Sequence, residues 1–294
     1  MTSISTGLTA STSLSQRTST SSKFKLSQKL LESARARLLE QETQVTLAEN
    51  VSIENFIDYI ENEQDLPVKI RLVDKKVIAY EVVLTPHGVV TGYVIALAYA
   101  NQLVGASEEN LIVGPNSYFT ADATIRPRRV PPPPLAQACN SSGYAYPTMV
   151  IEVGLGQSIR NLHELTPIYF SRRTTIMIFL LIKIYPVRQN GTRAMVAMLY
   201  LRTSPTPNVP VTAISFGNAR LNNSVVRYVQ NTVGTNVTGF VIGAPPCNGP
   251  NIPNYLLNIP ANALFNGAPG GIPNGLANGI NIDLWEIQDL ILNP

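Results

Sequence analysis

Two apolar segments that follow one another near the middle of the chain constrain its fold more than any other feature. Residues 174–185 read TTIMIFLLIKIY, residues 193–202 read RAMVAMLYLR, and the Asn190-Gly191 pair between them is typical of a tight hairpin turn. Uninterrupted apolar strands need both faces of their sheet covered. The first segment is shorter than the roughly 20 residues that cross a bilayer, and Lys183 interrupts it, so we expect a core strand.

Further strands and helices are expected before this hairpin. The Asp74-Lys75 pair lies between VKIRLV and KVIAYEVVL, which predicts another hairpin, and Thr85-Pro86 is a strong start for a buried helix over 86–103. Together these patterns predict an α/β fold with a mixed central sheet flanked by helices. The other expected elements are helices over 27–48, 53–62 and 157–169, and strands at NLIVG, DATIRP and 146–153.

The two ends of the chain differ in composition from its middle. Residues 1–22 are rich in Ser and Thr and lack the apolar run of a secretory signal, so we expect a disordered tail followed by a helical arm over 23–50. Residues 51–202 form the expected core. Residues 203–294 are rich in Pro, Asn and Gly, which predicts a loop-rich extension, either packed on the core or forming a small all-β unit.

The cysteines and the charges bear on compartment and partners. Cys139 and Cys247 are too few and too far apart for a disulfide framework, which favours a reducing, intracellular compartment, cytoplasmic or nuclear. The net charge of +3 permits DNA as a partner without indicating it, and no membrane partner is expected. The run RPRRVPPPP favours polyproline II from Pro131 to Pro134, as a rigid connector or as a docking segment for another protein.

Two carboxylates lie in or beside apolar strands. Asp122 precedes the strand ATIRP, and Glu152 lies within MVIEVG. A carboxylate in such a place is costly to bury unless something pairs with it. One reading is a salt bridge from Glu152 to an arginine such as Arg126 or Arg160. The other is a divalent-metal site, because Mg²⁺ takes one or two carboxylates and keeps waters as further ligands.

The order of these motifs resembles that of a known family. KIRLVDKKVIAYEVVLTPHG, an apolar helix, GPNSYFTADATIRP and then YPTMVIEVG resemble the Uma-type restriction endonuclease family of the PD-(D/E)XK nuclease superfamily, over roughly half of the chain. The resemblance implies a restriction-endonuclease-like core. It also implies that Asp122 and Glu152 are ligands of a catalytic Mg²⁺ or Mn²⁺, with His87 matching the histidine at the helix start.

The chain departs from the family pattern at several positions. The superfamily lysine would fall at Gly154, and the following stretch QSIRNLHELTPIYF has no lysine, so Arg160 or His163 would have to replace it. Ala121 stands where the family has proline. Arg71 stands where the family commonly has glutamate, and Lys75 where it has glycine. These departures predict an incomplete active site.

Three functions are therefore expected to compete. The first is a metal-dependent endonuclease acting on DNA with weak or lost activity, with Asp122, Glu152, His87, Arg160 and His163 as its candidate catalytic residues. The second is an inactive module that binds nucleic acid or protein. The third is a structural or self-associating protein on a nuclease-derived fold, because a fold alone does not establish a function.

Overall fold

The computed structural model describes residues 23–40, 42–63, 65–82, 84–234 and 237–293. The predicted disordered tail over 1–22 lies outside the described residues. Within them, no helix is both long enough and apolar enough to cross a membrane.

A large mixed sheet organises the described part of the chain. Its ten strands follow the order β1-β3-β2-β5-β6-β7-β8-β9-β10, with β4 paired to β5 outside this path. The pairs β6/β7 and β9/β10 are parallel and the other pairs are antiparallel. The strands are β1 Val45–Ala48, β2 Lys69–Val73, β3 Lys76–Glu81, β4 Leu103–Gly114, β5 Ser117–Pro127, β6 Met149–Gly154, β7 Ile178–Ile184, β8 Ala194–Leu201, β9 Thr212–Gly217 and β10 Val237–Thr238.

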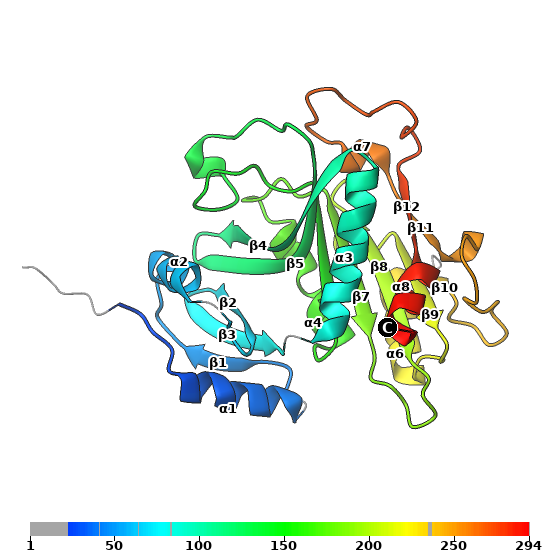
Figure 1. Cartoon of the computed structure of the whole chain (residues 1–294), viewed down its shortest axis with the longest axis horizontal. Coiled ribbons are helices and arrows are strands. Elements are labelled where there is room, and N and C mark those ends of the chain that lie inside the picture. Colours follow the sequence, from blue (N-terminus) through cyan, green and yellow to red (C-terminus); the bar gives the residue numbers. More distant parts are fainter. Residues whose placement is uncertain (1–22, 41, 64, 83, 235–236, 294) are drawn as a thin grey trace, which may run out of the picture.

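Helices cover both faces of the central strands, which is what the apolar segments required. The helices α3, α7 and α8 pack on one face, and α4, α5 and α6 pack on the other. Figure 1 shows α3 crossing the strands with α8 beside it. The helices are α1 Gln28–Leu39, α2 Ile53–Asn62, α3 Thr85–Ala100, α4 Ile159–His163, α5 Thr166–Tyr169, α6 Asn223–Val233, α7 Ala261–Leu264 and α8 Leu284–Leu292, with short 3₁₀ turns at Leu135–Gln137 and Pro253–Tyr255. The predicted α/β class with a mixed, helix-flanked sheet is confirmed.

The N-terminal strands have a core of their own. The strands β1, β2 and β3 pack against α1 and α2 around Phe56, Leu72 and Tyr118. Asp74 and Lys75 have positive φ angles of 46° and 66°, so the predicted hairpin turn is present between β2 and β3. The predicted helix over 53–62 is also present, and its N-cap Ser52 accepts a hydrogen bond from the Asn55 amide at 3.2 Å.

Two predicted helices are corrected by the structure. The helix expected over 27–48 ends at Leu39, and residues 45–48 form β1 instead. Val45 and Leu47 are buried while Thr46 is exposed, and this alternation suits a strand paired with β3. The helix expected over 157–169 is divided into α4 and α5. Pro167 lies in the first turn of α5, where a backbone N–H group would have no acceptor within the helix, so the missing N–H of proline costs no helical hydrogen bond.

The C-terminal residues contribute more regular structure than their composition predicts. Strand β9 pairs with β8 along its length, and α6 is an amphipathic helix that the sequence analysis missed. The segment IDLWEIQDLIL contains the end of β12 Ile280–Asp283 and all of α8, and β12 pairs with β11 Leu256–Ile259 in a separate two-stranded sheet. The domain boundaries at 22, 50 and 202 remain predictions.

Candidate functional site

Strand β5 changes its neighbour partway along its length. Near its start Tyr118 pairs with Leu72 of β2, whereas residues 123–125 pair with β6. Asp122 lies at this change, so it occupies the fork where β2 and β6 diverge. Because Ala123 pairs with Ile151 in an antiparallel ladder, the next position places Asp122 opposite Glu152. The prediction that the two carboxylates lie on adjacent strands agrees with this register.

A lysine that the sequence analysis did not consider contacts Asp122. Lys69, the first residue of β2, donates a hydrogen bond from its ammonium to Oδ1 of Asp122 and forms an ion pair with it. The side chains are only 9% and 3% exposed. Burial acts to lower the pKa of Lys69, but the charge and hydrogen bond of Asp122 outweigh it and the pKa is raised. The other carboxylate oxygen of Asp122 accepts the Val153 amide at 2.6 Å.

Glu152 has a different environment from Asp122. Its carboxyl group is 3% exposed and accepts a hydrogen bond from the hydroxyl of Tyr169 in α5. Burial raises the pKa of Glu152 well above its usual value, and the neighbouring charge of Asp122 raises it further, against the lowering effects of Tyr169, Lys69 and Arg71. The site therefore favours the protonated form of Glu152.

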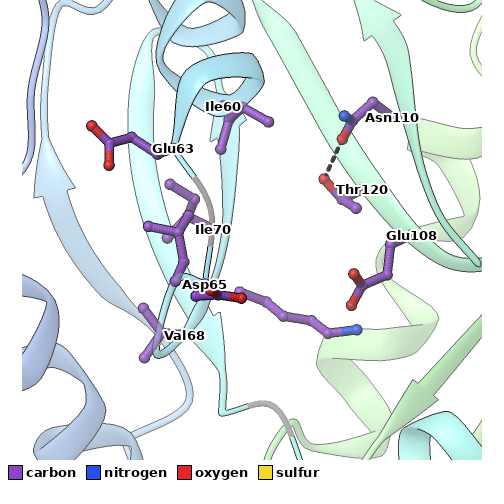
Figure 2. Close-up of a pocket in the computed structure, with 10 residues that line it drawn as sticks. Ile60, Glu63, Asp65, Val68, Ile70, Glu108, Asn110 and Thr120 are labelled. Carbon is purple, nitrogen blue, oxygen red and sulfur yellow. Dashed lines mark hydrogen bonds between the residues drawn. The ribbon is translucent and has the colours of Figure 1, made fainter.

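Two adjoining cavities open at the fork. A cavity of about 330 Å³ is lined by Asp122, His87 and Ser107, and one of about 480 Å³ extends from it between α2 and β4. Lys69 and Glu108 line both of them. Figure 2 shows the larger cavity, with Glu63 and Asp65 on the side of α2 and Glu108, Asn110 and Thr120 on the opposite side. Asp122 lines the smaller cavity, whereas Glu152 lines neither cavity. We predicted that both carboxylates face one cleft, and the cavities support this for Asp122 only.

His87 lies beside Asp122 at the start of α3. It is 4% exposed and lines the smaller cavity, and neither of its ring nitrogens has a hydrogen-bond partner in the part of the chain that the structure describes. Its Nε2 is 4.0 Å from Oε2 of Glu81, which is too long for a hydrogen bond. The structure thus brings His87 to the same cavity as Asp122, as the family resemblance implies.

The other two candidate residues have different partners. Nδ1 of His163 lies 2.8 Å from the hydroxyl of Tyr200, and burial lowers the pKa of His163. The guanidinium of Arg160 lies 5.5 Å from the ring centroid of Tyr228. Neither residue contacts Asp122 or Glu152, so neither is placed to replace the missing lysine.

The salt bridge considered for Glu152 is also wrong. Arg126 forms its ion pair with Glu109 of β4, while the partner of Glu152 is Tyr169. Both arginines that the sequence suggested as partners are therefore occupied elsewhere.

The chain has little similarity to known proteins. No protein-family model matches it, and no curated protein does. A solved structure from Anabaena variabilis, described as "a putative nuclease belonging to DUF820", is 12% identical, and the match covers 58% of this chain and 88% of that one with a TM-score of 0.38.

A second buried lysine lies near the position where the family lysine was expected. Lys183 of β7 pairs in register with Gly154 of β6, and its ammonium donates to the Leu155 carbonyl at 2.5 Å. Glu81 lies close by and accepts the amides of Leu155 at 3.0 Å and Gly156 at 2.5 Å. The signal in the sequence was the lysine inside the apolar run TTIMIFLLIKIY, which we had considered only as evidence against a membrane segment.

Restoring a lysine at Gly154 should destabilise the protein rather than complete the site. A Cβ atom at Gly154 would lie 2.4 Å from Cδ1 of Leu162, a fully buried residue of α4. We expect Gly154→Ala to lower the free energy of unfolding by about 1–3 kcal/mol, as overpacking of a core does. Urea denaturation would measure this loss, and the loss caused by Gly154→Ala should be smaller in a Leu162→Ala background, where the contacting methyl groups are absent. Equal stability of wild type and Gly154→Ala would contradict the packing argument.

Proposed function

We propose that this protein is a divalent-metal-dependent phosphodiesterase of low activity that acts on DNA. The observation that supports the proposal is the fork of β5, which places Asp122 opposite Glu152 and brings the ammonium of Lys69 to Asp122. Two carboxylates and a lysine are the functional groups that a PD-(D/E)XK site requires. In this chain the lysine comes from β2 instead of from the position of Gly154.

The donor set fits Mg²⁺ or Mn²⁺ in its chemistry. Asp122 and Glu152 are the residues that would hold the ion, and Mg²⁺ commonly uses one or two carboxylates and several waters. No cluster of three or more His, Cys, Asp or Glu side chains suitable for a metal occurs among the described residues, which is unfavourable for tight binding. When bound, such an ion activates water and shields the charge that develops on the phosphate.

The residues around the site explain why low activity is expected. The ammonium of Lys69 can attract a phosphate oxygen, but it already neutralises Asp122 and would have to share that carboxylate with the metal. Glu152 would have to lose its proton, which its burial opposes. The larger cavity is also acidic, with Glu63, Asp65 and Glu108 on its walls, and these charges repel a phosphate backbone.

One observation favours a second candidate, an inactive binding module. The Lys69–Asp122 ion pair neutralises the carboxylate of Asp122 without any metal. In that case the fold would serve a partner such as DNA, another copy of the chain or a protein docked on the prolines from Pro131 to Pro134. The two candidates differ in whether Mn²⁺ binds.

A plasmid-nicking assay with Mg²⁺ or Mn²⁺ tests the proposal. We expect slow nicking by the wild type and a loss of about 100-fold or more in Asp122→Asn, Glu152→Gln and Lys69→Met, because each removes an ionisable group that would act on the reacting phosphate or its metal. Asp74→Asn is the matched control, since this carboxylate lies in the exposed hairpin turn and should leave the rate unchanged.

Calorimetry with Mn²⁺ separates the two candidates. Binding by the wild type that is lost in Asp122→Asn would support the phosphodiesterase. Neither binding nor nicking by a correctly folded wild type would reject it and favour the inactive module. Nicking that survives in both carboxylate variants would show that the activity resides elsewhere.

A further inference from the structure

The guanidinium group of Arg71 is buried and forms no ion pair with a carboxylate of the described residues. Arg71 lies in the middle of β2 and is 7% exposed. Its Cζ lies 4.4 Å from the ring centroid of Tyr80 and 5.2 Å from that of Phe119. These rings attract the positive charge through the faces of their π systems. The rings hold the guanidinium in place, but they accept no hydrogen bonds from the N–H groups that lie in its plane.

The Nε donor of Arg71 lacks a partner within the described residues. Its Nε is buried and has no hydrogen-bond acceptor, and no carboxylate lies within 4.0 Å in an ion pair with it. A guanidinium has five donors and keeps its positive charge. Since buried donors are almost always satisfied in folded proteins, the unpaired Nε on this buried cation indicates that another group accepts from it.

Arg71 also lines a cavity of about 320 Å³ that is separate from the fork. The cavity lies between the segment before β1, the β2–β3 hairpin and the helices α4 and α5, and it shares no lining residue with the two cavities beside Asp122. Thr43, Gln44 and Asn161 contribute polar side chains to its walls, and Phe119 and Leu165 contribute apolar ones. Its volume is at the lower end of the range for small-molecule sites, about 300–1,000 Å³.

We propose that this cavity binds a phosphate group on the guanidinium of Arg71. A planar guanidinium offers two parallel N–H donors that match two oxygens of a phosphate, and this pairing is among the strongest hydrogen bonds in proteins. The aromatic rings position the cation, and the polar wall residues can donate to the remaining phosphate oxygens. Free phosphate and the terminal phosphate of a mononucleotide share this chemistry.

Glu164 is the acidic residue on the wall of this cavity. Its carboxylate does not form an ion pair with Arg71, but its negative charge opposes an incoming anion. Removing that charge should therefore strengthen phosphate binding. This expectation has the opposite sign to the effect of changing Arg71, so the two variants together identify the cavity.

Calorimetric titration in a phosphate-free buffer, without divalent metal, tests the site independently of any nuclease activity. Inorganic phosphate and a nucleoside 5′-monophosphate are the probes, with the unphosphorylated nucleoside and acetate as comparisons. We expect phosphate binding by the wild type and a loss of about tenfold or more in Arg71→Gln, as the removal of a charged hydrogen-bonding group predicts. Glu164→Gln should bind several-fold more tightly. Preference for inorganic phosphate or for the nucleotide identifies the source, and either supports the proposal.

Controls keep the result interpretable. Arg71→Lys retains the charge but loses the planar pair of donors, so it should fold and still bind phosphate more weakly than the wild type. Arg35→Gln makes the same charge change at an exposed position of α1 and should have no effect. Equal affinity in wild type, Arg71→Lys and Arg71→Gln, no binding of any phosphate, or binding of acetate as tight as that of phosphate would overturn the proposal.

Discussion

Asp122→Ala should lower the free energy of unfolding by about 3–5 kcal/mol, the usual cost of removing one partner of a buried ion pair. The variant leaves the ammonium of Lys69 in a site where that side chain is 9% exposed, and it removes the acceptor of the Val153 amide. Glu152 and Glu108 remain close enough to act on Lys69, which limits the loss. Urea denaturation followed by circular dichroism gives the free energies.

A double-mutant cycle separates the ion pair from the other effects. Lys69→Met combined with Asp122→Ala should recover much of the stability that Asp122→Ala loses, because no unpaired charge remains buried. Asp58→Ala is the matched control, since its ion pair with Lys23 is between side chains 52% and 73% exposed and should contribute less than about 1 kcal/mol. A loss no larger than that of the control would show that Lys69 reaches solvent when Asp122 is removed.

Lys183→Met should stabilise the protein near neutral pH by about 2–3 kcal/mol. Burial lowers the pKa of Lys183 from 10.5 to about 8, although the charge of Glu81 acts in the opposite direction. A gap of about 2.5 units corresponds to about 3 kcal/mol of cost for keeping this lysine charged in the folded state. The hydrogen bond to the Leu155 carbonyl, worth about 1 kcal/mol, is lost in the variant and offsets part of the gain.

The pH dependence gives the sharper test of this second prediction. Between about pH 8 and 10.5 the unfolded chain keeps the proton on Lys183 while the folded protein has released it, so the wild type should become more stable as pH rises through this window. Lys183→Met should lack that rise, and the two proteins should converge towards pH 10. Lys76→Met, at an exposed lysine of β3, is the control. Parallel stability curves for wild type and Lys183→Met would contradict the shifted pKa.

Local sequence patterns predicted those elements whose stability depends on near neighbours. The helix over 53–62 has its cap at Ser52, and the hairpin at Asp74-Lys75 has a turn that needs only two residues with positive φ. The long apolar strands 178–184 and 194–201 were recognisable because both of their faces are buried. Residues 45–48 were predicted wrongly, since the good helix formers around them conceal a short alternation that matters only once β3 is alongside.

The sequence by itself determined the fold class, and its motifs marked Asp122, Glu152 and His87 as candidate site residues. The pairing of β5 with β6 then places Asp122 opposite Glu152. The tertiary structure alone decided their partners. Lys69 is 53 positions from Asp122, and nothing in the residues around either one specifies that contact.

The same reason applies to the buried cations. Three contacts of buried cations depend on which strands become neighbours. They are the ion pair of Arg126 with Glu109, the contacts of Arg71 with two aromatic rings, and the position of Lys183 beside Gly154. Charge interactions in the interior act over a few ångströms of space and are insensitive to distance along the chain. A sequence pattern therefore identifies the residues that carry charge, whereas the packing of β2, β5, β6 and β7 decides which of them meet.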